Sequence, residues 1–247
     1  VMFSGLGAGV LWIPVLTFLD LRPSEAVSIS IFTQIAGKGT GSLTYLVNGM
    51  VDTRIVAAFT PMALIGVTLG FLAHFFMPQA YERILIYLFL VIAGYLLIKT
   101  ILSLKTPETA HNPDGQQERA PLYKSVPVVT LSSFFTGLLS IGNTDWLIPH
   151  MTLRLNMSTA RAVATGLFIM SVTTLFYLFL SCLTVWTGQA DWPQGTELLF
   201  ATCAGVILGG QIGTRLVRVP WFKAHQKHAF IVLLGLSLIH LFIESQC

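Results

Sequence analysis

Charge is what this sequence has least of. Asp, Glu, Lys and Arg make up 10% of its 247 residues, whereas an average soluble domain carries about 25%. A soluble protein this poor in charge could not cover its own surface with polar groups, so the composition excludes an ordinary soluble domain. The formal net charge is only +3, and the basic residues are scattered through short connections. Without a basic stripe, we exclude nucleic acid as a partner.

Cysteine and catalytic motifs are scarce as well. The chain has three cysteines, and none of them stands in a CxxC or Cys/His spacing that would bind a metal. We interpret Cys182 and Cys203, which lie inside apolar stretches, as small packing residues. The sequence has no HExxH zinc motif, no GxSxG elbow and no P-loop. We therefore expect no metal, no cofactor and no enzymatic activity, and an intramembrane enzyme is the remotest alternative.

Long apolar runs are what the sequence has in abundance, since 54% of its residues are hydrophobic. A transmembrane helix needs about 20 mostly apolar residues. We therefore predict an all-α fold, a polytopic transmembrane helical bundle of about eight apolar segments that is surrounded by membrane lipid. The segments cover residues 1–19, 26–47, 55–77, 84–104, 125–155, 162–187, 198–217 and 230–243.

A hydrophilic stretch at residues 105–124 divides the chain, and its Pro, Asn, Gly and Gln content is typical of a flexible linker. We predict a first transmembrane repeat at residues 1–104 and a second at residues 125–247, homologous halves of four segments each. Internal repeats are a recurring plan of secondary transporters. The sequence leaves open whether the repeats are parallel or inverted.

Each half opens with a Gly-rich or polar break that runs into a proline. The break and proline residues are Gly7, Gly9 and Pro14 in the first half and Gly142, Asn143, Thr144, Asp145 and Pro149 in the second. Residues 125–155 exceed the length of one span, so we predict a broken or re-entrant helix, whose irregular backbone must line a cavity or be buried in protein. The first segment is about ten residues shorter than its counterpart, which predicts a trimmed start or a very short first half-helix.

The two breaks predict a site for an anion. Glycine frees the backbone, and a proline restarts a helix near its N-terminal end. The N-terminus of a half-helix exposes unpaired N–H groups and the positive end of the helix dipole, which attract anions. We therefore predict that the break residues bind substrate. The alternative is that the glycines only allow close helix packing.

Lys38 lies in the middle of the second apolar segment. A lysine at the centre of a membrane helix costs about 2.5–3.5 kcal/mol on insertion scales. Gln34 lies one turn earlier on the same helix face. A cation beside half-helix N-termini suits an anionic cargo, so we predict that both side chains bind substrate. Alternatively, Lys38 extends to an interface or pairs with a structural carboxylate such as Asp145.

Asp145 has three readings. It is a proton site coupled to transport, a counter-ion for Lys38, or the N-cap of the half-helix that follows.

This pattern resembles the TauE/SafE family of sulfite and organosulfonate exporters, also called the toluene-sulfonate uptake permease group. The resemblance covers nearly the whole chain. The matching positions are Gly7, Gly9, Pro14, Gly142 and Pro149. The chain departs from the longer glycine run of the family, G-x-G-G-G, at Ala8, Asn143, Thr144 and Asp145. The resemblance implies a multi-pass permease of a bacterial or archaeal inner membrane that moves sulfur-containing anions.

The function expected from residues and resemblance together is a secondary transporter that exports sulfite or organosulfonates by alternating access between the repeats. Its predicted partners are the small anion, the membrane lipid and a coupling proton or sodium ion, with a homodimer left open. The alternatives are a passive anion channel and a membrane scaffold subunit that transports nothing.

Overall fold

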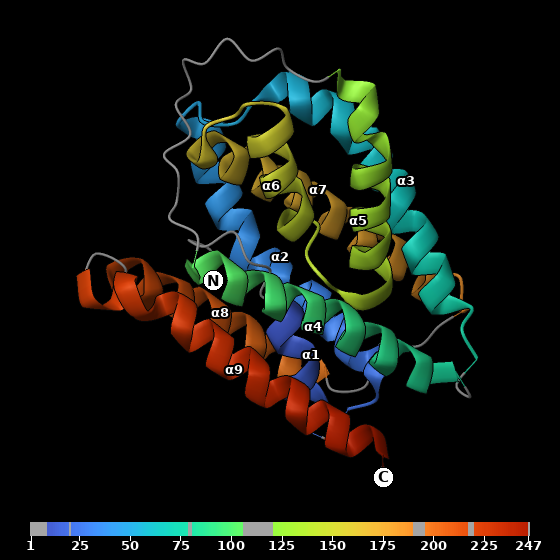
Figure 1. The fold of residues 1–247 in the computed structure, drawn as a ribbon. Helices are drawn as coiled ribbons and strands as arrows, with labels where there is room; N and C mark the ends of the chain where they lie inside the picture. The colour runs from blue at the N-terminus through green and yellow to red at the C-terminus, as the bar shows by residue number, and fades with distance from the viewer. Residues whose placement is uncertain are drawn as a thin grey trace.

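The computed structural model describes residues 9–19, 21–78, 81–105, 121–189, 196–216 and 220–246. Within these residues the chain forms helices and no strand, so the predicted all-α class is confirmed (Figure 1). The helices are α1 (Gly9–Thr17), α2 (Pro23–Val47), α3 (Thr53–Phe75), α4 (Glu82–Lys105), the 3-10 turn η2 (Leu122–Ser125), α5 (Val126–Leu139), α6 (Thr144–Arg154), α7 (Thr159–Trp186), α8 (Thr196–Leu216) and α9 (Pro220–Gln246).

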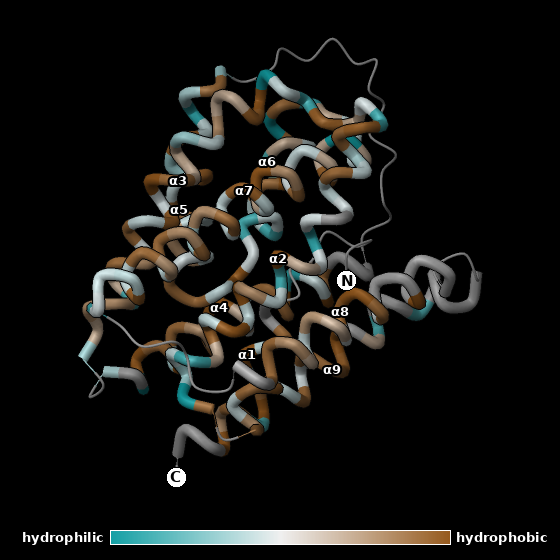
Figure 2. The backbone as a smooth tube through the Cα atoms, turned by 180° about the vertical axis from the view of Figure 1, so that it is seen from behind, coloured by the Kyte–Doolittle hydropathy of each residue, from teal (hydrophilic) through white to brown (hydrophobic). Residues whose placement is uncertain are grey.

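Four described helical stretches are long and apolar enough to cross a membrane. They lie in α3, in α4, in η2 with α5, and in α7, and shorter apolar stretches lie in α8 and α9. Hydrophobic residues run along nearly every described helix (Figure 2). The 25-residue α2 is absent from the four because its Ser, Thr, Gln and Lys residues lower its hydropathy. The described helices thus include four candidate spans, and the predicted total of eight spanning segments stays a prediction.

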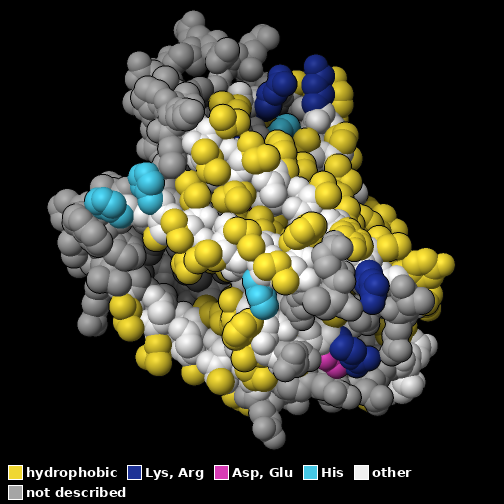
Figure 3. All heavy atoms as spheres, turned by 60° about the horizontal axis from the view of Figure 1, so that its bottom comes forward, with side chains coloured by type: hydrophobic (Ala, Val, Ile, Leu, Met, Phe, Trp, Pro, Cys, Tyr) yellow, Lys and Arg dark blue, Asp and Glu magenta, His cyan; other side chains and the backbone are white. Residues whose placement is uncertain are grey.

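The outer surface of the described bundle is apolar. Large hydrophobic side chains of α3, α4 and α9 are exposed, among them Ile65, Val91 and Leu236. Hydrophobic side chains are spread over the described part of the face in Figure 3, and few charged side chains lie among them. Single exposed hydrophobic residues are normal in soluble proteins, but a contiguous apolar surface marks contact with lipid or another protein.

Local sequence explains several helix ends. Pro23 is the first residue of α2, where a missing N–H costs nothing. The Asp52 side chain accepts hydrogen bonds from the backbone N–H groups of Arg54 and Ile55 and so caps α3. At the end of α5, Ser140 adopts a left-handed conformation with φ of 57°. This conformation is uncommon for a residue with a side chain, and it ends the helix.

Helices from before residue 105 pack mainly against helices from after residue 121. The packed pairs are α2 with α7 and α8, α3 with α5 and α7, and α4 with α9. In Figure 1, α3 and α5 lie on one side of the molecule, and α8 and α9 lie on the other. The division into repeats at residues 1–104 and 125–247 stays a prediction, and most of the predicted linker lies outside the described residues.

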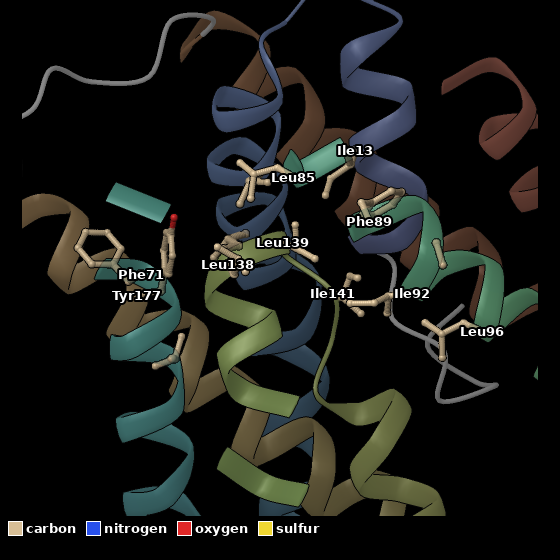
Figure 4. Packing of buried hydrophobic residues seen from close by; sticks show 14 of the residues in the cluster. Ile13, Phe71, Leu85, Phe89, Ile92, Leu96, Leu138, Leu139, Ile141 and Tyr177 are labelled. Carbon is tan, nitrogen blue, oxygen red and sulfur yellow. The ribbon is translucent and has the colours of Figure 1, made fainter. Parts of the chain in front are cut away.

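The largest apolar core surrounds the end of α5. Leu138, Leu139 and Ile141 pack there with residues of α1, α3, α4 and α7 (Figure 4). Phe71 of α3 meets Tyr177 of α7 edge to face, with ring centroids 5.1 Å apart. This core fixes the chain just before α6 begins, so it positions the polar residues that follow.

Glycines bring α3 and α5 into backbone contact. A side chain at Gly66 would collide with the carbonyl oxygen of Thr130, and one at Gly70 would collide with that of Phe134. Small residues of this kind let membrane helices approach closely. Gly66 and Gly70 therefore serve close helix packing, whereas Gly209 of α8 has no described atom within 4 Å of a built Cβ.

Replacing Gly70 by alanine is expected to lower the melting temperature of the detergent-purified protein. The added methyl group overpacks the α3–α5 contact, which costs about 1–3 kcal/mol. Gly94→Ala in α4 is the matched control, because no described atom lies within 4 Å of its built Cβ. Alanine's helix preference, worth about 1 kcal/mol, should leave that variant as stable as the parent protein or more so. Equal melting temperatures of the two variants would contradict the close contact.

Candidate functional site

Lys38 is held inside the protein, with 5% of its surface exposed. Its Nζ donates to Oε1 of Gln34, 2.6 Å away, and contacts Sδ of Met170 in α7 at 2.7 Å. Gln34 and Met170 are buried as well. The alternative that Lys38 extends to an interface is therefore wrong. Lys38 and Gln34 are hydrogen-bonded to each other, and their binding of substrate stays a prediction.

Gln34 connects Lys38 to the chain between α5 and α6. Its Nε2 donates to Oγ of Ser140 at 2.7 Å and to the carbonyl oxygen of Ser140 at 3.2 Å. The Ser140 hydroxyl in turn donates to Oγ of Ser30, 2.7 Å away. These hydrogen bonds fix the amide of Gln34 with its oxygen toward Lys38. They also satisfy a carbonyl that would otherwise be unpaired in the bundle interior.

The predicted interruption of residues 125–155 is present in the structure. Helix α5 ends at Leu139 and α6 begins at Thr144, and all the residues between them are buried. The carbonyl oxygen of Ile141 accepts from Oγ1 of Thr136 at 2.7 Å. Among the described residues, no side chain caps the N-terminus of α6. Side chains thus satisfy the carbonyl groups of Ser140 and Ile141, and the carbonyl groups of Gly142 and Asn143 accept from backbone N–H groups of α6. A helix N-terminus without a side-chain cap has the polarity that an anion needs.

Asp145 lies close to Lys38. Only 6% of it is exposed, and its carboxylate interacts electrostatically with the Lys38 ammonium. It is the second residue of α6, and the N-cap position belongs to Asn143. The N-cap reading of Asp145 is therefore wrong, while the counter-ion reading has an interaction to support it. An opposite charge nearby is what makes a buried lysine tolerable.

The first residues of α6 complete the cluster. The Thr144 hydroxyl contacts Sδ of Met170 at 3.7 Å, the same sulfur that Lys38 contacts. Nδ2 of Asn143 donates to Oγ of Ser133 at 3.4 Å, and the buried Asn143 Oδ1 has no hydrogen-bond partner among the described residues. A half-turn of this amide would present its NH₂ group instead, so Asn143 can offer a donor or an acceptor.

The two prolines lie inside helices. Pro14 is the sixth residue of α1, and Pro149 is the sixth residue of α6. The sequence predicted a proline near the N-terminal end of each half-helix, and both prolines lie in the second helical turn. A threonine follows each proline by three residues, and both Thr17 and Thr152 donate to the carbonyl groups three and four residues earlier. The two proline steps thus have the same local hydrogen bonding.

The structure brings together some of the predicted site residues and not others. Lys38, Gln34, Thr144 and Asp145 meet where α2, α6 and α7 converge, and Gly142 and Asn143 lead into α6. Gly9 is the first residue of α1, and the described hydrogen bonds of Lys38 and Gln34 do not include it. Gly7 lies outside the described residues.

Sequence reasoning missed two residues of this cluster. Ser140 is hydrogen-bonded to both Gln34 and Ser30, and Met170 contacts both Lys38 and Thr144. A serine before a glycine break and a methionine in an apolar helix are ordinary residues of membrane proteins. The available signal for Met170 was its position, because it is the twelfth residue of α7 as Gln34 is the twelfth of α2.

Comparison with known proteins agrees with the resemblance in the sequence. The family described as "Sulfite exporter TauE/SafE" matches residues 1–241. A "Probable membrane transporter protein ORF9" from Sinorhizobium sp. is 23% identical over 235 residues, which cover 94% of this chain and 84% of that relative. No solved structure matches the chain.

Proposed function

The chain belongs to the sulfite exporter TauE/SafE family of multi-pass membrane transporters, and on that premise we propose that it exports sulfite or an organosulfonate from a bacterial or archaeal cell across the inner membrane. The observation that carries the proposal is the buried Lys38 ammonium beside the uncapped N-terminus of α6. A buried cation beside the positive end of a helix dipole favours a small anion as cargo.

In this proposal each polar residue has its own role. Lys38 supplies the charge that attracts the anion. Gln34 orients the Lys38 ammonium by accepting a hydrogen bond from its Nζ. The backbone N–H groups of Gly142, Asn143 and Thr144 bind oxygens of the anion. A sulfite or sulfonate group presents three oxygens to these donors, which chloride does not. Gly7 and Gly9 would supply the corresponding end in the first half.

Asp145 competes with the anion in this site. Its carboxylate and the anion attract the same ammonium group, so an anion binds more easily when Asp145 carries a proton. This competition is a direct route to coupling between proton movement and anion movement. Coupling to sodium remains a prediction from the sequence.

The position of the site supports alternating access. Lys38 and Gln34 come from before the predicted linker, whereas Met170, Thr144 and Asp145 come from after it. A movement of one set of helices against the other would change which side of the membrane reaches the site, as in other transporters built from repeats.

The direct test is ligand-dependent melting of the detergent-purified protein. Sulfite, sulfate, taurine, sulfoacetate and phosphate are compared with chloride at constant ionic strength. An anion that binds the folded state raises the melting temperature as its concentration passes its dissociation constant. We expect sulfite or a sulfonate to raise it selectively. A variant with Lys99, an exposed lysine of α4, replaced by alanine serves as the control and should respond as the parent does. A protein that responds to none of these anions contradicts the proposal.

A further inference from the structure

Two acceptors of different strength meet the Lys38 ammonium. From α2, Gln34 offers an amide oxygen at 2.6 Å, and from α7, Met170 offers a thioether sulfur at 2.7 Å. An ammonium group has three donors, and a thioether is a weak acceptor. The side of Lys38 that faces α7 is therefore the side on which a better acceptor would gain most.

The Met170 sulfur lies between two donors. Lys38 contacts it from one side, and the Thr144 hydroxyl, at the first residue of α6, contacts it at 3.7 Å. Met170 itself is fully buried, so no solvent competes for these donors. A place lined by an ammonium and a hydroxyl suits a negatively charged oxygen, because charge-assisted hydrogen bonds are roughly twice as strong as neutral ones.

The place of Met170 in the fold matches that of Gln34. Counted from the first residues, Pro23 and Thr159, the two side chains are each the twelfth residue of their helices. Helices α2 and α7 pack against each other, α2 packs on α8 as α7 packs on α3, and α1 packs on α2 as α6 packs on α7. The two equivalent positions thus face the same cation, one with a strong acceptor and one with a weak acceptor.

We propose that Met170 determines the affinity and selectivity of the oxyanion site, because its sulfur occupies the place beside Lys38 and Thr144 that an oxygen of the substrate takes. Substrate binding exchanges the sulfur for that oxygen. A weak acceptor at this position keeps the Lys38 ammonium oriented and is easily displaced by a substrate oxygen. A strong acceptor would compete with the substrate for the ammonium group. This inference rests on the proposed function, since it concerns the same site.

Two replacements of Met170 separate the acceptor from the shape of the side chain. Met170→Gln supplies an amide oxygen to Lys38 and Thr144, and we expect its affinity for sulfite or a sulfonate to fall by about tenfold or more. Its melting temperature without anion should equal or exceed that of the parent. Met170→Leu keeps the approximate volume and removes the acceptor. We expect it to bind the anion at least as tightly as the parent and to melt at a lower temperature without anion.

Met151→Leu in α6 is the matched control, because Met151 is also fully buried and packs against Gly166, and it belongs to a different apolar cluster. Its anion affinity and its preference for sulfonate over chloride should not change. Parent-like anion affinity in Met170→Gln, or loss of anion binding in Met170→Leu, would overturn the assignment. If Lys38 variants lose the anion response while both Met170 variants keep it, only this inference fails. If the parent protein shows no response, the proposed function fails with it.

Discussion

Replacing Lys38 by methionine is expected to abolish anion transport. Methionine keeps the length of the side chain and removes the charge that attracts the substrate. Losing one partner of a buried, hydrogen-bonded charge pair costs about 2–5 kcal/mol, which corresponds to a roughly 30- to 5000-fold loss of affinity. The measurement is uptake of a radiolabelled sulfonate into proteoliposomes that contain the parent protein or the variant.

The loss of transport must be separated from a loss of folding. Lys38→Met leaves the Asp145 carboxylate without its nearby cation, and an uncompensated buried charge destabilises a protein. The double variant Lys38→Met/Asp145→Asn removes both charges, so its melting temperature should recover most of the loss. Its transport should not recover. A double variant that moves sulfonate at the parent rate would remove Lys38 from the mechanism. Flux that rises with concentration without saturating would favour a channel over a carrier.

Asp145→Asn is expected to give the second-largest effect, in the opposite direction for binding. If the carboxylate competes with the anion for Lys38, its removal should tighten anion binding by about tenfold, within the range usual for coupling between sites. Anion exchange across the membrane should continue in this variant. Transport driven by a proton gradient should be lost, because the exchangeable proton is lost.

The pH dependence of binding tests the same point without a gradient. In the parent protein, sulfonate binding should tighten as the pH falls, because a proton taken up by the Lys38–Asp145 pair makes the site more positive. In Asp145→Asn, the change in binding between pH 6 and pH 8 should be smaller than in the parent protein. A sulfonate is the right probe because its own charge does not change in this range. Weaker binding by Asp145→Asn at both pH values would show that the carboxylate supports the anion site instead of opposing it.

The sequence predicted the helical class and the core of the site for reasons that can be named. The insertion cost of a central lysine pointed to Lys38, and the one-turn spacing to Gln34. The glycine and polar residues at 142–145 predicted the break between α5 and α6. These signals are local in the chain, and each carries a clear energetic consequence in a membrane.

The remaining features depend on contacts between distant parts of the chain. Helix α2 falls below the hydropathy expected of a span because it carries polar residues to the centre of the bundle, as with Ser30, Thr33 and Gln34. Met170 meets Lys38 across 132 positions of the sequence, and its apolar neighbours give no hint of that role. Pro14 and Pro149 were expected near the N-terminal ends of their helices and lie in the second turn, where a proline removes only one backbone hydrogen bond.

The pairing of early helices with late ones has a consequence for how the protein is made. Because α3 packs through its glycines on α5, and α4 packs on α9, these two helices have their main partners among helices synthesised after them. As the chain leaves the ribosome, α3 and α4 enter the membrane before these partners, so the faces that contact α5 and α9 are uncovered at first. A membrane chaperone or the insertion machinery would have to shield Gly66 and Gly70 until α5 arrives.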